Sequence, residues 1–199
     1  PCSSPPSCSH CVGIADRIRV TDAAGAEFRR RESDVSCATG NVSQVRRFLA
    51  DGSAAVTDMV YDDHGRLSRV TGPANTAGER TTLDYVYDTT VGVHVISVTD
   101  HFGHQSTATY NFKQALVLTS TDRNGQVITN AYDPFGRLAT VVGPYEQGTG
   151  QVTLAFQYNP HAPVPWALPR HIDTFRSLSD PIETALFIDG LKRVVQTKK

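Results

Sequence analysis

Long apolar runs are missing from this 199-residue sequence. No stretch approaches the about 20 consecutive apolar residues that a membrane-spanning helix needs. Neither sign of charge is in excess, since 19 Lys and Arg face 20 Asp and Glu and the net charge is -1. No basic stripe marks a footprint for a phosphate backbone. The sequence predicts neither a membrane segment nor a nucleic-acid partner.

A signal peptide is also missing, because the first residues, PCSSPPSC, lack its charged and apolar regions. Hydrophobic residues make up 39% of the chain, which is enough for a buried core in one domain. The chain starts at Pro1 and stops at Lys199, directly after a strand-like apolar run. We expect it to be a piece of a longer protein.

Cysteine is scarce and unevenly placed. Cys2, Cys8 and Cys11 lie in the first eleven residues, and Cys37 follows alone. With His10 as an alternative ligand, these residues could hold zinc, but the second CxxC half of a zinc ribbon is missing. An even number of cysteines in an exported chain also fits two disulfides. Disulfides, free thiols and a metal site therefore stay open, and none implies catalysis.

A short phrase recurs along the chain: Asp, two residues, Gly, then a polar or basic residue. The clear copies are YDDHGRL from Tyr61, TDHFGH from Thr99, TDRNGQ from Thr121 and YDPFGRL from Tyr132. A degenerate copy starts at Thr21, a copy without Gly in register starts at Tyr87, and Ile188–Arg193 looks like a contracted copy. Recurrence within one chain is the signature of a repeat architecture.

The phrase predicts a hairpin turn. The Asp carboxylate can accept backbone N–H groups of the turn, and Gly supplies the positive φ with which such turns close. We assign a structural role to the turn residues and a catalytic role to none. The predicted turn residues are Tyr61, Asp62, Gly65, Arg66, Tyr87, Asp88, Asp100, Gly103, Asp122, Gly125, Tyr132, Asp133, Gly136, Arg137, Asp189 and Gly190.

The segments between these turns alternate with period two, as half-buried strands do. Examples are 82–87, 107–112 and 152–158, while 93–98 and 116–118 are apolar on both faces and are expected to be covered on both sides. Segment 41–50 could be a helix capped by Asn41, but the Asp51-Gly52 hairpin signal favours a strand. The predicted fold class is all-β with antiparallel hairpins.

Three blocks are predicted: a Cys-containing leader with the first strands (1–40), repeat hairpins (41–158) and a Pro-rich crossover with final strands (159–199). Pro/Gly-rich breaks at 71–78, 143–150 and 159–169 are expected to separate blocks of strands. The lone Trp166 is expected to be a packed plug where the chain crosses between hairpins, and the repeated tyrosines are expected to form aromatic ladders.

Two phrases, YDDHGRLSRVTGP and YDPFGRLATVVGP, resemble the YD repeat of Rhs proteins, which is also found in B and C components of Tc toxin complexes and in teneurins. The stretches PVPWALPRHIDTF and LFIDGLKRVVQTKK are similar to the segment that leads into the Rhs repeats of Tc toxin B-type proteins. The resemblance covers about residues 40 to 199. It implies a curved strip of hairpins that belongs to a shell around a toxic cargo.

In that family an aspartyl-protease-like core closes the shell and cuts the cargo free. This sequence contains neither that core nor a cargo domain, so self-cleavage is not carried over to Asp62, Asp133 or any other residue. Other chemistry finds little support. His101-x-x-His104 with Asp100 fits a solvated turn better than a metal site, Ser177 lies in no nucleophile elbow, and the Gly143–Gly150 loop lacks a Gly-Lys-Ser/Thr end.

The sequence thus predicts a non-catalytic wall segment of a secreted or delivered bacterial toxin-like protein, with no cofactor. Its expected partners are the rest of the parent shell, the cargo and other toxin-complex subunits. The isolated chain is expected to associate through open sheet edges. A closed β module that recognises a receptor, carbohydrate or partner subunit is the alternative. An enzyme is a third hypothesis, which would need a metal at the leader or a pocket joining Arg170, His171 and Asp173.

Overall fold

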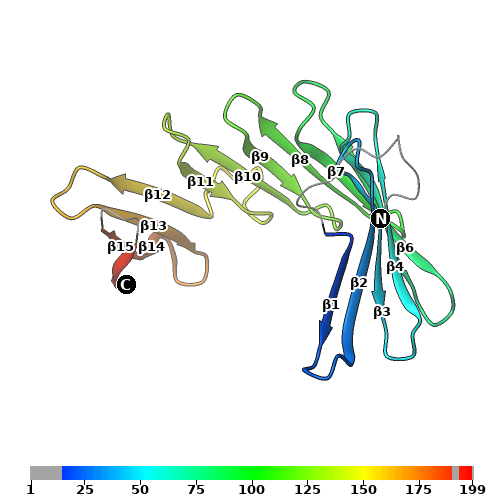
Figure 1. The fold of residues 1–199 in the computed structure, drawn as a ribbon. Coiled ribbons are helices and arrows are strands. Elements are labelled where there is room, and N and C mark those ends of the chain that lie inside the picture. The colour runs from blue at the N-terminus through cyan, green and yellow to red at the C-terminus, as the bar shows by residue number, and fades with distance from the viewer. Residues whose placement is uncertain (1–14, 190–192, 199) are drawn as a thin grey trace. The chain divides into compact units, whose positions relative to one another are not determined.

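The computed structural model describes residues 15–189 and 193–198 (Figure 1). The described residues form strands, turns and loops, and they include no helix that could cross a membrane. The strands are β1 (Arg17–Thr21), β2 (Glu27–Val35), β3 (Val42–Phe48), β4 (Ala54–Tyr61), β5 (Leu67–Ala74), β6 (Arg80–Tyr87), β7 (Val95–Asp100), β8 (Gln105–Asn111), β9 (Leu116–Thr121), β10 (Val127–Tyr132), β11 (Leu138–Val142), β12 (Leu154–Asn159), β13 (Trp166–Asp173), β14 (Ser177–Glu183), β15 (Ala185–Ile188) and β16 (Val194–Lys198).

The strands are hydrogen-bonded in the order of the sequence from β1 to β13 in one open antiparallel sheet. β13 then contacts two strands along one side, β14 near Arg170 and β15 near Trp166, and β16 pairs with β15. Sequential antiparallel pairing follows from the short turns, because a tight turn can join only neighbouring antiparallel strands. The predicted fold class of all-β antiparallel hairpins is confirmed.

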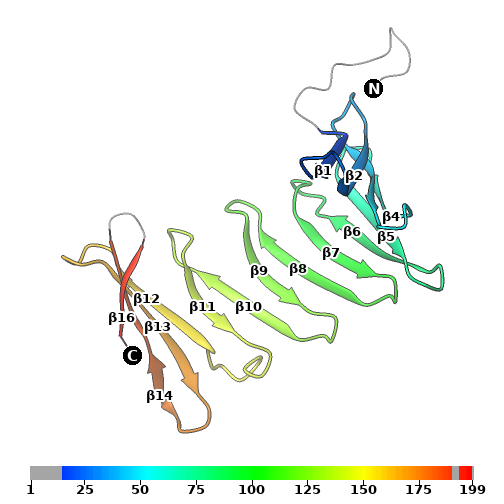
Figure 2. The same cartoon turned by 60° about the horizontal axis from the view of Figure 1, so that its bottom comes forward.

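The chain divides into two compact units. The first contains the described residues up to Tyr87 together with Ser97–Gln105, and the second contains Asp88–Ile96 and the described residues from Ser106 onward. The hairpins of both units can be followed in Figure 2.

One face of strands β1–β6 in the first unit carries a ladder of ion pairs, and we call it the ion-pair face. Nη1 and Nη2 of Arg46 donate to the two carboxylate oxygens of Asp34 at 2.7 Å each, and Nη1 of Arg80 lies 2.6 Å from Oδ2 of Asp58. The guanidinium of Arg46 holds the pKa of Asp34 below its usual range. The charged residues of this face that form ion pairs are Arg17, Arg30, Glu32, Asp34, Arg46, Asp58, Arg69, Arg80 and Asp84.

The other face of β1–β6 carries a row of aliphatic side chains together with three arginines, Arg29, Arg31 and Arg47, and we call it the apolar face. Register places its side chains opposite one another: Met59 opposes Val70, and Val70 opposes Leu83. Cross-strand neighbours of this kind stabilise a sheet by about 0.2–1 kcal/mol per pair. The aliphatic residues at these positions are Ile18, Val20, Val45, Met59, Val70 and Leu83.

No hydrophobic side chain is buried among the described residues, although the composition is sufficient for a buried core. One sheet cannot cover its own two faces, and its apolar side chains remain half-buried or exposed. The segment 93–98 is expected to be covered on both sides; Val93, which precedes β7, is 67% exposed, whereas the residues of β7 within it are half-buried or buried. The buried groups are polar, and they are Asp88, Ser97, Glu146 and Asp173.

The local predictions agree with the structure in part. Segment 41–50 contains strand β3, as the Asp51-Gly52 signal indicates, and not a helix. The break at 159–169 is the connection of the β12–β13 hairpin, and Pro169 lies within β13 opposite Phe156. Trp166 begins β13 and is only half-buried, opposite Asn159, so it is a strand residue and not a plug.

The turn glycines allow a direct test of backbone strain. Gly125 has φ +78°, and no atom lies within 4 Å of the place that a Cβ would take, so only its conformation constrains it. Gly125→Ala is expected to lower the free energy of unfolding by about 1 kcal/mol, and Gly125→Asn by less, because Asn tolerates the left-handed region. Urea unfolding measures both. Equal stability of both variants and the parent chain would contradict this reading of the turn.

Candidate functional site

Seven hairpin turns of the described residues share one backbone closure. In the turn that starts at Asp62, the amide of Asp62 donates to the Arg66 carbonyl and the amide of Gly65 donates to the Asp62 carbonyl, both at 2.9 Å. Gly65 has φ +76°, as a three-residue hairpin loop with a glycine bulge requires. Six of these turns start with Asp or Asn, at Asp22, Asp62, Asn75, Asp100, Asp122 and Asp133, and the seventh starts at Leu49.

The side chain of the Asp that starts the turn accepts hydrogen bonds from backbone amides of the same turn. Oδ1 of Asp62 accepts the amides of His64 and Arg66 at 2.9 Å each. Asp133 does the same with Phe135 and Arg137. The predicted role of the repeat aspartates as turn acceptors agrees with these bonds.

An arginine four residues after the Asp adds a charged bond. Nε of Arg66 donates to Oδ2 of Asp62 at 2.7 Å, and Nε of Arg137 donates to Oδ2 of Asp133 at 2.6 Å. The bond from Arg66, together with the turn amides, lowers the pKa of Asp62 to about 2. Asp62 is therefore ionised and saturated with donors at neutral pH.

The same arginine reaches a tyrosine two strands further along. The guanidinium carbon of Arg66 lies 4.6 Å from the ring centroid of Tyr87, and Arg137 has the same distance to Tyr158. The Tyr87 hydroxyl donates to the carbonyl of Leu67, the residue that follows Arg66, and Tyr158 donates in the same way to Leu138. We call each set of Asp, Arg and Tyr the turn cassette, and the described residues contain two: Asp62, Arg66 and Tyr87, and Asp133, Arg137 and Tyr158.

The tyrosine bond recurs more often than the full cassette. Five tyrosines on even-numbered strands donate to a carbonyl near the start of the preceding odd-numbered strand. The pairs are Tyr61 with Val42, Tyr87 with Leu67, Tyr110 with Val95, Tyr132 with Val117 and Tyr158 with Leu138, at 2.7–3.0 Å. The tyrosines expected to form aromatic ladders thus act as much through their hydroxyl groups as through their rings.

The repeat phrase covers two kinds of turn. Tyr-Asp copies leave the even-numbered strands β4, β6 and β10, and Thr-Asp copies, at Asp22, Asp100 and Asp122, leave odd-numbered strands. Antiparallel order within a unit places these two kinds at opposite edges of its strands. Sequence reasoning missed two such turns, at Asn75 and Asn111, whose side chains accept turn amides. The signal was available, because Asn can replace Asp as a turn acceptor.

Among the turn aspartates of the described residues, the Asp88 carboxylate accepts the most hydrogen bonds. Its two oxygens accept the amides of five residues, Thr90, Val91, Gly92, Val93 and His94. Burial favours the neutral carboxyl and is the largest single effect, but the amides together outweigh it and hold the pKa well below its usual range. The turn is longer than the other Asp turns, which explains why Gly92 falls out of register with the repeat.

The copy at Ile188–Arg193 is not contracted. Asp189 donates its amide to the Arg193 carbonyl, and Arg193 donates its amide and its Nε to the Asp189 carboxylate. The spacing from Asp to Arg is therefore four residues, as in Asp62 and Arg66. The prediction was wrong because it followed the glycine, whereas the closure depends on the Asp-to-Arg spacing. Gly190 lies outside the described residues.

The cysteine hypotheses concern residues that lie mainly outside the described part of the chain, since Cys2, Cys8, Cys11 and His10 are not among the described residues. Cys37 is disulfide-bonded. Within the described ranges no group of three or more His, Cys, Asp or Glu residues could hold a metal ion. The pairing of the cysteines stays a prediction.

The residues considered for acid-base chemistry are not brought together. Arg170 forms an ion pair with Glu183 at 2.6 Å, while Asp173 accepts the turn amides of Phe175 and Arg176. His171 is exposed on β13 opposite Ile182. His104 lies 3.1 Å from Asp100 in a solvated turn, as the sequence predicts.

The glycine-rich loop 143–150 closes on itself. The Thr153 hydroxyl donates to Glu146 and accepts the Gly143 amide, both at 2.6 Å. A Cβ on Gly143 would lie 2.9 Å from that hydroxyl, so glycine is required there for close approach. The amides of Gly143, Glu146 and Thr149 donate to groups within this segment and Thr153.

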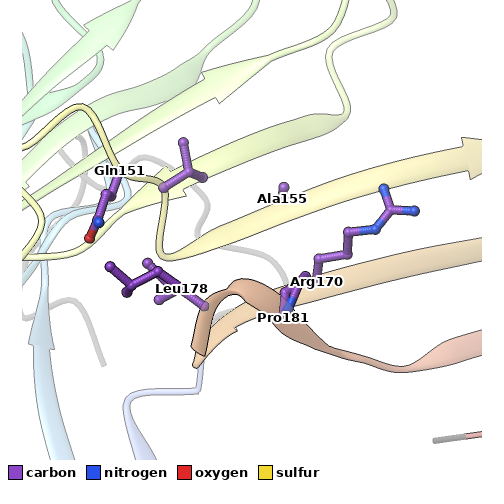
Figure 3. A pocket seen from close by; sticks show the side chains of 7 residues that line it. Gln151, Ala155, Arg170, Leu178 and Pro181 are labelled. Carbon is purple, nitrogen blue, oxygen red and sulfur yellow. The ribbon is translucent and has the colours of Figure 1, made fainter. Parts of the chain in front are cut away.

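The second unit has a shallow pocket of about 250 Å³ (Figure 3). Arg170, whose charge is paired, and Gln151 are its polar members. The other lining residues are Val152, Ala155, Ile172, Leu178 and Pro181. The pocket could accept an apolar side chain, but it contains no acid, base or nucleophile arranged for catalysis.

No protein-family model and no curated protein matches the sequence. Among solved structures, the chain is similar to part of the crystal structure of TcdB2-TccC3, with a TM-score of 0.57 and 14% identity over 87% of this chain and 11% of that chain. The crystal structure of TcdB2-TccC3-Cdc42 gives a TM-score of 0.38, 13% identity and coverages of 91% and 13%. A mutated Photorhabdus luminescens Tc holotoxin pore gives 0.28, 12%, 88% and 14%.

Of these likenesses, the one to TcdB2-TccC3 has a TM-score above 0.5, and at 14% identity it shows a shared fold alone. The chain spans about a tenth of the length of that neighbour. Its open all-β hairpin arrangement is therefore found within a Tc toxin structure.

The tyrosine hydroxyl can be tested separately from its ring. Tyr87→Phe keeps the ring under Arg66 and removes the donor to Leu67, so it is expected to lower the free energy of unfolding by about 1 kcal/mol. Tyr85→Phe is the control, because Tyr85 lies on the same face of β6 and its hydroxyl has no hydrogen bond to the described residues. Chemical denaturation measures both, and equal losses would contradict the assigned role.

The low pKa of Asp62 predicts acid sensitivity. The unfolded state takes up this proton near the ordinary value of 3.8 and the folded state only near 2, so the contribution of Asp62 to stability is complete above about pH 4 and is lost as the pH falls toward 2. Asp62→Asn is expected to flatten the slope of stability against pH in this window. Urea unfolding between pH 2 and 5 measures it, with Asp63→Asn as the charge-matched control. An unchanged slope in Asp62→Asn would refute the link.

Proposed function

We propose that this chain is a non-catalytic wall segment of an Rhs/YD-repeat shell that encloses a toxin cargo within a large bacterial Tc-toxin-like or polymorphic toxin protein. The observation that carries the proposal is the turn cassette, which links a hairpin turn to the strand two further along. The shared fold with TcdB2-TccC3 supports it.

The cassette suits a wall because each copy links a hairpin to the next strand along the sheet. Asp62 and Arg66 belong to the β4–β5 turn, Tyr87 belongs to β6, and the Tyr87 hydroxyl returns to the first residue of β5. Three consecutive strands are thus linked, and a further cassette can link the next ones. Because no closed core has to be filled, the number of hairpins is not fixed by these contacts. Stability in such arrays comes from nearest neighbours.

The absence of a buried core in the described residues also fits a wall. Apolar side chains that remain half-exposed on a sheet face favour a partner that covers them in a larger assembly. We include the rest of the shell, its cargo and other toxin-complex subunits among the proposed partners. Export or delivery of the parent protein belongs to the same proposal.

The ionisation of the turn carboxylates supports a wall without catalytic activity. Asp62, Asp88, Asp122 and Asp133 have lowered pKa values because turn amides, joined by an arginine at Asp62 and Asp133, donate to their oxygens. A carboxylate held ionised by such donors is a weak proton donor at neutral pH. Sealed sheet edges, which a closed binding module requires, are not found among the described strands, because β1 pairs only with β2 and β16 only with β15.

Solution scattering separates the wall from the closed module. An open strip is expected to associate through its edge strands, so its radius of gyration should exceed the about 16 Å of a compact domain of this length and rise with concentration. Small-angle X-ray scattering with light scattering measures this. Val195→Pro in edge strand β16 should reduce the association, whereas Val195→Thr should not. A constant value near 16 Å would favour the closed module.

The enclosure itself is tested on the native parent protein, isolated with an antibody against this chain. Electron cryomicroscopy should show the chain within the wall of a hollow particle, and the cargo should resist protease until the particle is unfolded. A cargo that is cleaved as fast as the wall would refute enclosure.

A further inference from the structure

Three arginines without an ion pair to the described residues lie next to one another on the apolar face of the first unit. They are Arg29 and Arg31 on β2 and Arg47 on β3, and we call them the arginine triplet. All three side chains belong to exposed residues. Figure 1 shows their two strands side by side next to β1.

Register brings the triplet together. Arg31 lies directly opposite Arg47 in the β2–β3 ladder, and Arg29 lies two residues before Arg31 on the same face. Directly opposed residues have Cβ atoms about 5 Å apart, and alternate residues on a strand are about 7 Å apart. Three positive charges are therefore held within one small area.

The positive charges of the triplet are not neutralised by nearby carboxylates of the described residues. No ion pair joins Arg29, Arg31 or Arg47 to a carboxylate in the part of the chain that the structure describes. Like charges directly opposed across a ladder destabilise a sheet. On the ion-pair face of the same strands, Arg30 and Arg46 both have acidic partners, Glu32 and Asp34. The cluster of arginines without an acidic partner therefore lies on one side of the sheet, while on the ion-pair face Arg19 is a single arginine without an ion pair to the described residues.

The neighbours of the triplet are apolar. Ile18 opposes Arg31 and Val20 opposes Arg29 on β1, and these two side chains are 55% and 51% exposed. Ala55 opposes Arg47 on β4. A partner that fits this surface carries carboxylates next to aliphatic groups.

We infer that the arginine triplet is a docking surface for an acidic polypeptide segment in extended conformation. Guanidinium groups form two-pronged hydrogen bonds with carboxylates. An extended peptide with acidic residues at alternate positions presents carboxylates about 7 Å apart, which matches the spacing of Arg29 and Arg31. Its aliphatic residues would cover Ile18 and Val20. Three charges without a longer basic stripe fit a short acidic peptide better than a nucleic-acid backbone.

The inference goes beyond the wall role, and it can hold or fail independently because it concerns binding by this chain itself. The probe is a fluorescein-labelled peptide with the core Glu-Leu-Glu-Leu-Glu, and its partner probe replaces each Glu by Gln. Fluorescence anisotropy with the full chain is expected to give a Kd on the order of 100 μM for the acidic peptide, weakening as NaCl is raised. The Gln peptide is expected not to bind.

Variants locate the site. Arg31→Gln and Arg47→Gln should each weaken binding by about threefold, and the triple variant with Arg29→Gln by about tenfold or more. The melting temperature should stay equal or rise, because the substitutions relieve repulsion. Arg19→Gln is the matched control, since Arg19 is an exposed arginine on β1 with no ion pair to the described residues but lies on the opposite face, where it opposes Arg30.

Four results would overturn the inference. They are no binding of the acidic peptide up to about 1 mM, equal weakening by Arg19→Gln and Arg31→Gln, equal binding of a single-stranded oligonucleotide, and equal binding to vesicles of anionic lipid. The last two would assign the triplet to a general polyanion surface, and the second would assign the effect to overall charge.

Discussion

The hydrogen bonds between one carboxylate oxygen and the amides of its own turn are the contact on which the other features of this structure depend. They are local, because in the turn that begins at Asp62 donors and acceptor lie within five residues. Each such bond contributes about 1 kcal/mol net, or more when the acceptor is charged. By closing the turn, the carboxylate fixes which residues of the two strands oppose one another. In the hairpins that have this turn, the register next to the turn follows from that closure.

A second contact, between the turn arginine and a tyrosine two strands further along, connects residues that are more distant in the sequence. It holds neighbouring hairpins together without a buried core. Arg66 and Arg137 contact both the Asp of their turn and the tyrosine two strands on, so one guanidinium connects a local turn to a neighbouring hairpin. The tyrosine hydroxyl then bonds the backbone next to the arginine. Such a tie does not require a second layer of structure, which agrees with the lack of buried hydrophobic side chains among the described residues.

The two faces of β1–β6 differ in a way that alternation alone creates. Because successive side chains of a strand point to opposite faces, the run Arg29-Arg30-Arg31 is divided between them. Arg30 joins the ion-pair face, and its guanidinium lies 3.6 Å from the ring of Phe48, whereas Arg29 and Arg31 remain beside aliphatic residues. A sheet with mainly paired charge on one face and, on the other, a cluster of arginines unpaired within the described residues is suited to different surroundings on its two sides.

The sequence by itself determined what depends on neighbours along the chain. Asp, Gly and alternating apolar residues act within a few positions, so strands such as β3, the turns at Asp62 and Asp133, and the all-β fold class could be predicted. The same local reasoning could have found the turns at Asn75 and Asn111, since both side chains accept turn amides as Asp does. It misjudged Asp189 because it followed the glycine in place of the spacing to Arg193.

Only the tertiary structure decided what depends on register between strands. Arg66 stacks on Tyr87 and Arg31 opposes Arg47 because specific strand pairs align in specific registers, and no pattern within either strand contains that information. The lack of buried hydrophobic side chains among the described residues has the same origin. Apolar alternation predicts that a strand has a face to cover, but whether another layer covers it depends on where the rest of the protein lies.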